Sequence, residues 1–129
     1  MAERRRSAGQ KVLVVEDDPD NRWVTVRMLS GAGYTPLEAG DGYEAIEIAR
    51  REAPALILMD LALPRMDGWE ATRRIKADPA LCRIPVLAVT ALTMQADEQR
   101  ARAAGVDEYV TKPVRSAKIR AMVRRYVGS

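Results

Sequence analysis

The stretch LILMDLALPRMDG, residues 56–68, decides the fold of this chain. It begins with four apolar residues, Leu56–Met59, which run directly into Asp60. A short, uninterrupted apolar run is typical of a strand that is buried on both faces of a parallel sheet. The carboxylate that follows therefore indicates a strand that ends at a polar edge of the sheet.

Similar apolar runs occur at four other places and alternate with amphipathic stretches. The runs predicted as strands are 12–15, 35–38, 56–59, 85–89 and 108–110. The stretches predicted as helices are 20–30, 41–51, 69–77, 94–104 and 116–127. Strands that alternate with helices in this way predict a three-layer α/β fold, in which five helices cover both faces of a five-stranded, doubly wound parallel sheet.

Local signals refine these helices. Asp41 and Asp67 each stand at the start of a predicted helix and suit an N-cap, and we expect Asp18 to cap or lie at the surface rather than bind metal. Gly68 is expected in a turn. The apolar set of the first predicted helix consists of Trp23, Val24, Val26, Met28 and Leu29.

The length of 129 residues suits one compact domain, which we place at residues 11–127 after a flexible basic arm at 1–10. The single cysteine, Cys82, excludes an internal disulfide and is expected to be partly buried. No apolar stretch is long enough to span a bilayer, so we expect a cytoplasmic protein with no membrane partner.

The net charge of +3 raises the question of nucleic acid. Basic residues cluster at Arg4, Arg5, Arg6, Arg115, Lys118, Arg120, Arg124 and Arg125. No nucleic-acid-binding motif accompanies them, so we expect solvated faces and a loose arm. Histidine is absent, which removes the usual general base and the commonest metal ligand.

Polar side chains follow the predicted strands at the points where the strands end. These residues are Glu16, Asp17, Asp18, Asp60, Thr90, Thr111 and Lys112. Ligands of open parallel sheets collect at this edge. Converging carboxylates without histidine or thiolate favour a hard divalent cation, Mg²⁺ or Mn²⁺, with open positions for phosphate oxygens.

Asp60 is the candidate nucleophile, because it alone stands at the end of a central buried strand. No nucleotide-binding loop of the Walker type occurs, so a phosphoryl group has to come from another molecule. A carboxylate beside a divalent cation can form an acyl phosphate, while a lysine and a hydroxyl stabilise the charge on the phosphoryl oxygens.

Four segments, VLVVEDD, LILMDLALPRMDG, AVTA and YVTKP, resemble in this order the receiver domain of bacterial two-component response regulators. The resemblance covers nearly all of 11–127 and implies the flavodoxin-like strand order 2-1-3-4-5. Within the CheY-like superfamily, the chain is most similar to single-domain regulators of the DivK type.

The resemblance implies a role for each matching residue. Asp60 matches the aspartate that takes a phosphoryl group from a partner histidine kinase or phosphotransfer protein. The implied Mg²⁺ ligands are Glu16, Asp17, Asp60 and the Ala62 carbonyl. Thr90 and Lys112 match the residues that bind the phosphoryl group. Thr90 and Tyr109 match the switch pair, and Pro113 matches the family's cis proline.

The resemblance also implies that the signal leaves through the face of the fourth helix, fifth strand and fifth helix. The residues expected on this face are Met94, Arg100, Tyr109, Lys118 and Met122. Ala62 and Leu92 occupy positions where faster-hydrolysing relatives carry polar side chains. We therefore expect a persistent phosphoryl group on Asp60.

Three alternatives stay open. The first alternative to a single-domain regulator is a receiver excised from a hybrid histidine kinase or from a longer transcriptional regulator. A degenerate, phosphate-independent scaffold is disfavoured by the complete set of site residues. An aspartyl-nucleophile hydrolase of the haloacid dehalogenase type is also disfavoured. Such enzymes usually carry the nucleophilic aspartate directly after the first strand and a second aspartate two residues on, whereas this chain has Glu16 followed by Asp18.

Overall fold

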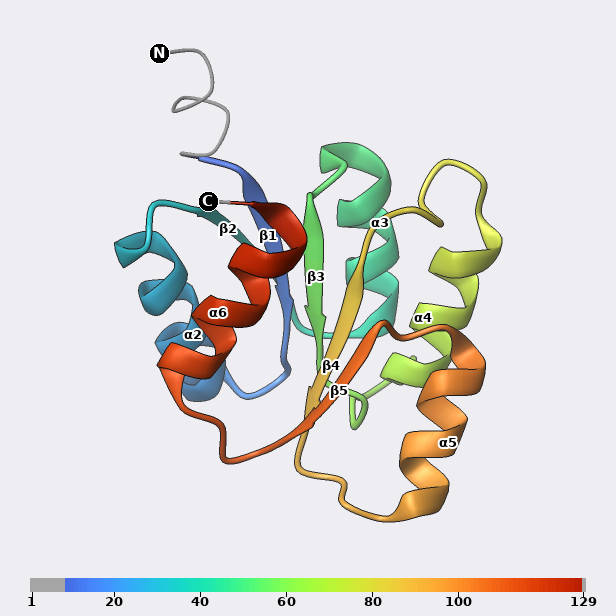
Figure 1. Ribbon diagram of the computed structural model, residues 1–129. Helices are drawn as coiled ribbons and strands as arrows, with labels where there is room; N and C mark the ends of the chain where they lie inside the picture. Colours follow the sequence, from blue (N-terminus) through green and yellow to red (C-terminus); the bar gives the residue numbers. More distant parts are fainter. Residues whose placement is uncertain (1–8, 129) are drawn as a thin grey trace.

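The computed structural model describes residues 9–128, and the expected basic arm lies for the most part outside them. Five parallel strands form one sheet in the order β2-β1-β3-β4-β5, so the predicted strand order is confirmed (Figure 1). The strands are β1 (Lys11–Val15), β2 (Thr35–Ala39), β3 (Leu56–Met59), β4 (Val86–Thr90) and β5 (Glu108–Thr111). The helices are α2 (Pro19–Gly31), α3 (Gly42–Glu52), α4 (Gly68–Ala77), α5 (Gln95–Ala104) and α6 (Ser116–Val127).

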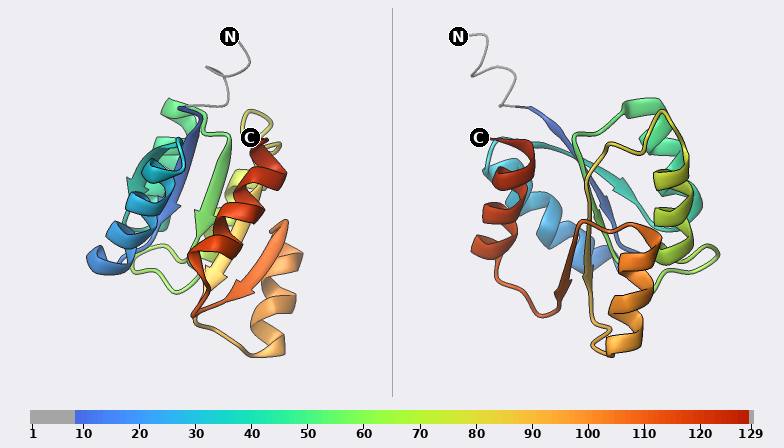
Figure 2. Two further views of the ribbon diagram at one scale, coloured as in Figure 1. Left: turned by 60° about the vertical axis from the view of Figure 1, so that its left-hand side comes forward. Right: turned by 45° about the vertical axis from the view of Figure 1, so that its right-hand side comes forward.

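The helices form a layer on each face of the sheet, with α2 and α6 on one face and α3, α4 and α5 on the other (Figure 2). Alternate residues of β3 pack into the cores on the two faces of the sheet. Ile57 and Met59 belong to the core under α3, α4 and α5, whereas Leu56 and Leu58 belong to the core under α2 and α6. All four are buried, as the uninterrupted apolar run predicts.

The predicted helix caps are confirmed. The side chains of Asp18, Asp41 and Asp67 accept hydrogen bonds from the backbone N–H of Asp20, Glu44 and Glu70. Each cap satisfies an N–H that has no partner within the helix.

Helix α2 turns only part of its apolar set toward the sheet, since Trp23 and Val24 are 59% and 55% exposed. The predicted apolar set spans too wide an arc for one helix face, since successive residues turn by about 100° and only a stripe of that width can face a core. Leu29 therefore packs against the sheet, and Val26 and Met28 are partly buried beside it.

Two burial predictions were wrong. Cys82 is exposed, because the buried position of that turn is taken by Leu81. Met122 was expected on an exposed face but is only 4% exposed, since it lies on the side of α6 that packs against the sheet.

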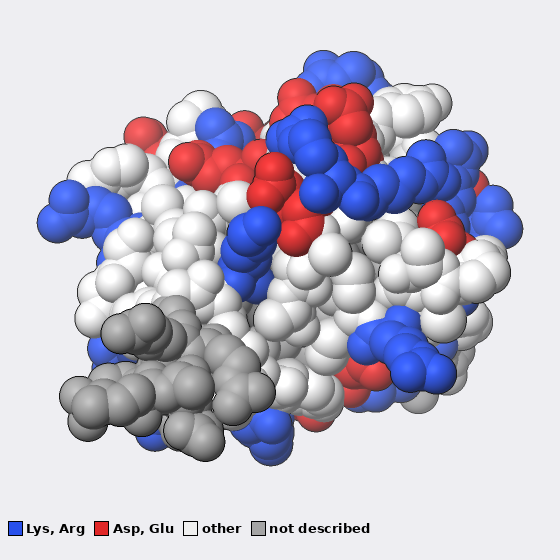
Figure 3. Space-filling model, turned by 90° about the horizontal axis from the view of Figure 1, so that it is seen from above, with Lys and Arg blue, Asp and Glu red and all other residues white. Residues whose placement is uncertain are grey.

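The opposite end of the sheet, where the strands begin, carries charges of both signs. Seen from above, basic and acidic residues are interleaved (Figure 3). Ion pairs such as Lys11 with Glu52 and Arg50 with Asp78 join them. None of the helices in the described part of the chain has the length and apolar character needed to cross a membrane.

Candidate functional site

Three acidic side chains converge at the carboxyl ends of β1 and β3. Glu16 and Asp17 follow β1, and Asp60 follows β3, its neighbour in the sheet. One carboxylate oxygen from each residue lies within 4.8 Å of the others. Glu16 and Asp60 are only 6% and 8% exposed, while Asp17 is open to solvent. The structure therefore brings together three of the four carboxylates that the sequence predicts at this edge, without Asp18, which caps α2.

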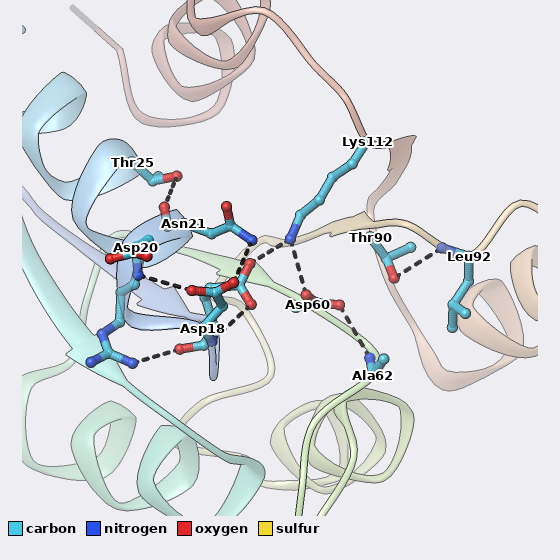
Figure 4. Close-up of polar contacts among 11 residues, drawn as sticks. Asp18, Asp20, Asn21, Thr25, Asp60, Ala62, Thr90, Leu92 and Lys112 are labelled. Carbon is cyan, nitrogen blue, oxygen red and sulfur yellow. Dashed lines mark hydrogen bonds and ion pairs between the residues drawn. The ribbon is translucent and has the colours of Figure 1, made fainter.

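Lys112 places its ammonium group between two of these carboxylates (Figure 4). Its Nζ donates to Glu16 and, at 3.1 Å, to Oδ2 of Asp60. Burial would lower the pKa of Lys112, but the bonds to both carboxylates outweigh it and hold the pKa above its usual value. The ammonium form is therefore the one that faces Asp60 at neutral pH.

The pKa of Glu16 is raised, although an ion pair with a lysine usually lowers the pKa of a carboxyl group. Burial is the largest influence on its pKa, and the nearby charge of Asp60 acts in the same direction. Together they raise the pKa of Glu16 above its usual value in spite of the hydrogen bond from Lys112. Two crowded carboxylates that share one ammonium form a site that gains from a further cation.

The second oxygen of Asp60 is held by the loop that follows. The backbone N–H of Ala62 donates to Oδ1 of Asp60 at 3.1 Å (Figure 4). The carboxylate is therefore oriented by Lys112 on one oxygen and by the main chain on the other. The side chain of Ala62 is exposed.

Thr90 and Tyr109 meet at the backbone of Leu92. Thr90 is fully buried at the end of β4, and its Oγ1 accepts a hydrogen bond from the Leu92 N–H at 3.4 Å. The Tyr109 hydroxyl donates to the Leu92 carbonyl at 2.7 Å. The carbonyl of Thr90 also accepts from the Lys112 N–H at 2.7 Å, and the Lys112–Pro113 peptide bond is cis.

Sequence reasoning missed Arg22. From the first turns of α2, its Nη1 donates to the Glu16 carbonyl at 2.7 Å, and its Nε donates to Glu38 at 2.9 Å. These bonds fix the backbone that carries Glu16 and Asp17. An arginine among other polar residues gives no local signal of this role, because its partners come from β1 and β2.

The donor set fits Mg²⁺. Its oxygens come from carboxylates, two of them nearly buried, and neither histidine nor thiolate belongs to the cluster. Mg²⁺ prefers such oxygen ligands and usually takes only one or two carboxylates with water in the remaining positions. The exposed Asp17 leaves the cluster accessible from solvent.

Comparison with known proteins agrees with this geometry. Residues 12–124 match the response regulator receiver domain. The chain is 37% identical over 119 residues to the polar-differentiation response regulator DivK of Brucella anthropi, an alignment that covers 92% of this chain and 97% of the relative. DivK of Brucella ovis matches with the same identity and coverage.

Two solved structures extend the comparison. The receiver domain of a sensor histidine kinase from Pseudomonas aeruginosa, with a magnesium ion coordinated in its active site cleft, is 39% identical, with a TM-score of 0.87 over 95% of this chain and all of that one. The chemotaxis protein CheY4 of Vibrio cholerae is 28% identical, with a TM-score of 0.86 over 92% of this chain and 99% of that one. The chain belongs to the response regulator receiver domain family.

Proposed function

We propose that Asp60 is the residue on which this receiver domain, residues 11–127, accepts its phosphoryl group. The observation that carries the proposal is the position of Asp60 at the end of the central strand β3, with the Lys112 ammonium 3.1 Å from one carboxylate oxygen. An oriented carboxylate beside a fixed positive charge is a suitable nucleophile for phosphoryl transfer.

The transfer forms a bond between an Asp60 carboxylate oxygen and phosphorus, and it breaks the nitrogen–phosphorus bond of a phosphohistidine. The electron pair of the broken bond stays on the donor's imidazole, which takes up a proton. Lys112 and Thr90 bind the oxygens of the phosphoryl group. The domain thus catalyses its own phosphorylation and its slow dephosphorylation and has no separate substrate to convert.

We infer that the cation is held by Glu16, Asp17, Asp60 and the Ala62 carbonyl. Mg²⁺, or Mn²⁺ in its place, would neutralise negative charge on the phosphoryl oxygens. The carboxylate cluster supports this assignment, and so does the magnesium ion in the related Pseudomonas aeruginosa receiver.

The partners follow from the same chemistry. The donor is a histidine kinase or a histidine phosphotransfer protein in the cytoplasm. We assign the downstream protein to the face of α5, β5 and α6, where Met94 is 69% exposed and Arg100 and Lys118 are also open to solvent. Met122 is excluded from this face by its burial.

A second candidate is a receiver that works within a hybrid histidine kinase. The observation that favours it is the 39% identity to the receiver of a sensor kinase. Both candidates use the same site and differ in whether the phosphoryl donor belongs to the same polypeptide. The genomic reading frame around the coding sequence distinguishes them.

The test is phosphorylation by acetyl phosphate with MgCl₂, followed by intact-protein mass spectrometry. The wild-type chain gains one phosphoryl group, and Asp60→Asn gains none because its side chain is no longer a carboxylate nucleophile. Asp67→Asn, which keeps a capping side chain at the start of α4, serves as the matched control and is labelled like the wild type. Labelling of Asp60→Asn would overturn the assignment.

A further inference from the structure

The loop that carries Ala62 is tied to the turn between β2 and α3. This loop, residues 61–67, leads from Asp60 to α4. Near its end, the Met66 carbonyl accepts a hydrogen bond from the Gly42 N–H at 2.9 Å. Beside it, Nε of Arg65 donates to Oδ2 of Asp41 at 2.5 Å. Two consecutive residues of the loop therefore contact two consecutive residues at the start of α3.

Asp41 is a rigid attachment point for this loop. It is 4% exposed, and its Oδ1 already caps α3 by accepting from the Glu44 N–H at 2.8 Å. Burial would raise the pKa of Asp41, but the bonds from Glu44 and Arg65 outweigh it and hold the pKa below its usual value. The helix cap holds one oxygen of this charged carboxylate, and the other oxygen accepts from Arg65.

Arg65 adopts a backbone conformation that is unfavourable for a residue with a side chain. Its φ is +64°, in the left-handed region, where a residue with a Cβ is disfavoured by about 1–2 kcal/mol. Its side chain is 63% exposed, so apolar burial does not hold it there. The charge-assisted bond to Asp41 offsets this strain.

Gly42 shows that the loop backbone is seated closely. A Cβ at this position would lie 2.6 Å from the Met66 carbonyl oxygen, closer than real Cβ atoms approach a backbone oxygen. The start of α3 therefore leaves room for the main chain of the loop and for nothing larger.

We propose that Arg65 is a positioning residue for the cation site: held by Asp41, it fixes the loop so that Ala62 stands in place beside Asp60. The inference rests on the proposed cation site, and it adds two residues that touch neither the cation nor the phosphoryl group. Arg65 differs in this from exposed pairs such as Arg51 with Glu47, which lie on one helix and hold no loop.

The first experiment is a calorimetric titration of the metal-free full chain with MgCl₂, without a phosphoryl donor. Arg65→Ala keeps the Cβ, and with it the same backbone strain, but removes the bond to Asp41. We expect its Kd for Mg²⁺ to rise about tenfold, the low end of the effect of residues that orient metal ligands. Arg51→Ala removes another exposed, ion-paired arginine and leaves the Kd unchanged. An unchanged Kd in Arg65→Ala overturns the proposal.

A second pair of variants tests whether Arg65 acts through Asp41. Asp41→Asn keeps a side chain that caps α3 but loses the charge that holds Arg65. If the two residues act as one unit, the double variant Asp41→Asn, Arg65→Ala binds Mg²⁺ no more weakly than Arg65→Ala alone. Fully additive losses would mean that the two residues act separately and would overturn the pairing.

Gly42→Ala provides an independent check from the other side of the loop. The added methyl group has to displace the Met66 carbonyl, so we expect the same direction of change in the Kd while circular dichroism still reports a folded chain. Acetyl phosphate labelling is then measured on the same samples. Absent labelling of wild type with an intact difference in Mg²⁺ binding would reject phosphorylation at Asp60 and support the positioning role.

Discussion

The Tyr109 hydroxyl donates a 2.7 Å hydrogen bond to the carbonyl oxygen of Leu92. The N–H of the same residue donates to the hydroxyl oxygen of Thr90. The two residues proposed as the switch are therefore joined through one peptide segment at the start of the loop between β4 and α5. A movement of Thr90 toward a phosphoryl group would disturb the segment that holds Tyr109.

Tyr109→Phe should loosen this loop without unfolding the domain. The substitution removes a hydrogen bond whose net contribution is about 1 kcal/mol, which corresponds to a shift of about fivefold in the equilibrium between two loop arrangements. We expect faster amide hydrogen exchange at residues 91–94 and little change in β1 or β3. Tyr126→Phe, which loses a hydroxyl bonded to Glu108, is the control. Equal exchange in both variants would contradict the role of Tyr109.

Gly68→Ala should damage the site through the main chain of Asp60. A Cβ on Gly68 would lie 2.3 Å from the Asp60 carbonyl oxygen and 2.7 Å from the Leu61 Cα. Because both neighbours are backbone atoms, we expect a loss of about 1–3 kcal/mol in the free energy of unfolding and a lower rate of labelling by acetyl phosphate.

The control for this substitution is Gly31→Ala at the end of α2. A Cβ on Gly31 would meet no atom within 4 Å. The variant should therefore be as stable as the wild type, as measured by urea unfolding. A Gly68→Ala protein with the stability of Gly31→Ala would show that α4 can move away from Asp60 at no cost.

The close packing at Gly68 marks the boundary of what the sequence predicts. Apolar runs identified the inner strands β1, β3 and β4 because these are buried on both faces, and Leu56–Met59 and Ser116–Val127 have the predicted bounds. Short acidic residues identified three caps for the same local reason. Gly68 was expected to serve a turn, yet its place in the first turn of α4 is required by the approach of a distant backbone.

The residues of the site were also predictable only in part. Glu16, Asp17 and Asp60 could be grouped because adjacent parallel strands end at one edge. Arg22 and Arg65 could not, since nothing in the sequence beside either arginine points to its partner: Glu38 lies on β2, and Asp41 directly precedes α3. Contacts made by regular elements are encoded in periodic patterns, whereas contacts made by loops depend on conformations such as the positive φ of Arg65.

Lys112→Met should make the domain depend on added cation. The variant leaves Glu16 and Asp60 close together without the ammonium that both now contact. In the presence of a chelator we expect the free energy of unfolding to fall by about 1–3 kcal/mol, because a partly buried charge pair loses its partner. MgCl₂ should then stabilise the variant more than the wild type.

Thermal unfolding with and without MgCl₂ measures this difference. Lys118→Met, at an exposed position of α6, controls for the loss of a lysine. If Mg²⁺ raised the melting temperature of wild type and Lys112→Met equally, Lys112 would not compete with the cation for the carboxylates.

Asp41 should make the domain less stable at acidic pH. Its folded pKa lies below its usual value of 3.8, so the folded state binds this proton less readily than the unfolded chain. The stability that Asp41 contributes is therefore fully present above that usual value and is lost as the pH falls through the lower, folded value. Asp41→Asn, which does not titrate, should lack this loss.

Urea unfolding between neutral pH and about pH 2 tests the sign. The wild type should be more stable than Asp41→Asn at neutral pH, and the difference should shrink as the solution becomes acidic. In Arg65→Ala the same shrinkage should be smaller, because one cause of the lowered pKa is gone. A difference that stays constant with pH would contradict the pairing.

The side chains around Asp60 should set the lifetime of its phosphoryl group. Ala62 is exposed beside the nucleophile and Leu92 is partly buried beyond Thr90, and neither offers a polar atom to orient a water molecule for attack. Ala62→Asn introduces an amide at the exposed position. We expect it to speed the loss of the phosphoryl group roughly tenfold, about 1.4 kcal/mol in activation free energy. The measurement follows phosphorylated protein with time in MgCl₂ after removal of acetyl phosphate. Ala121→Asn, at an exposed position of α6, should match the wild type, and equal lifetimes in all three proteins would refute the explanation.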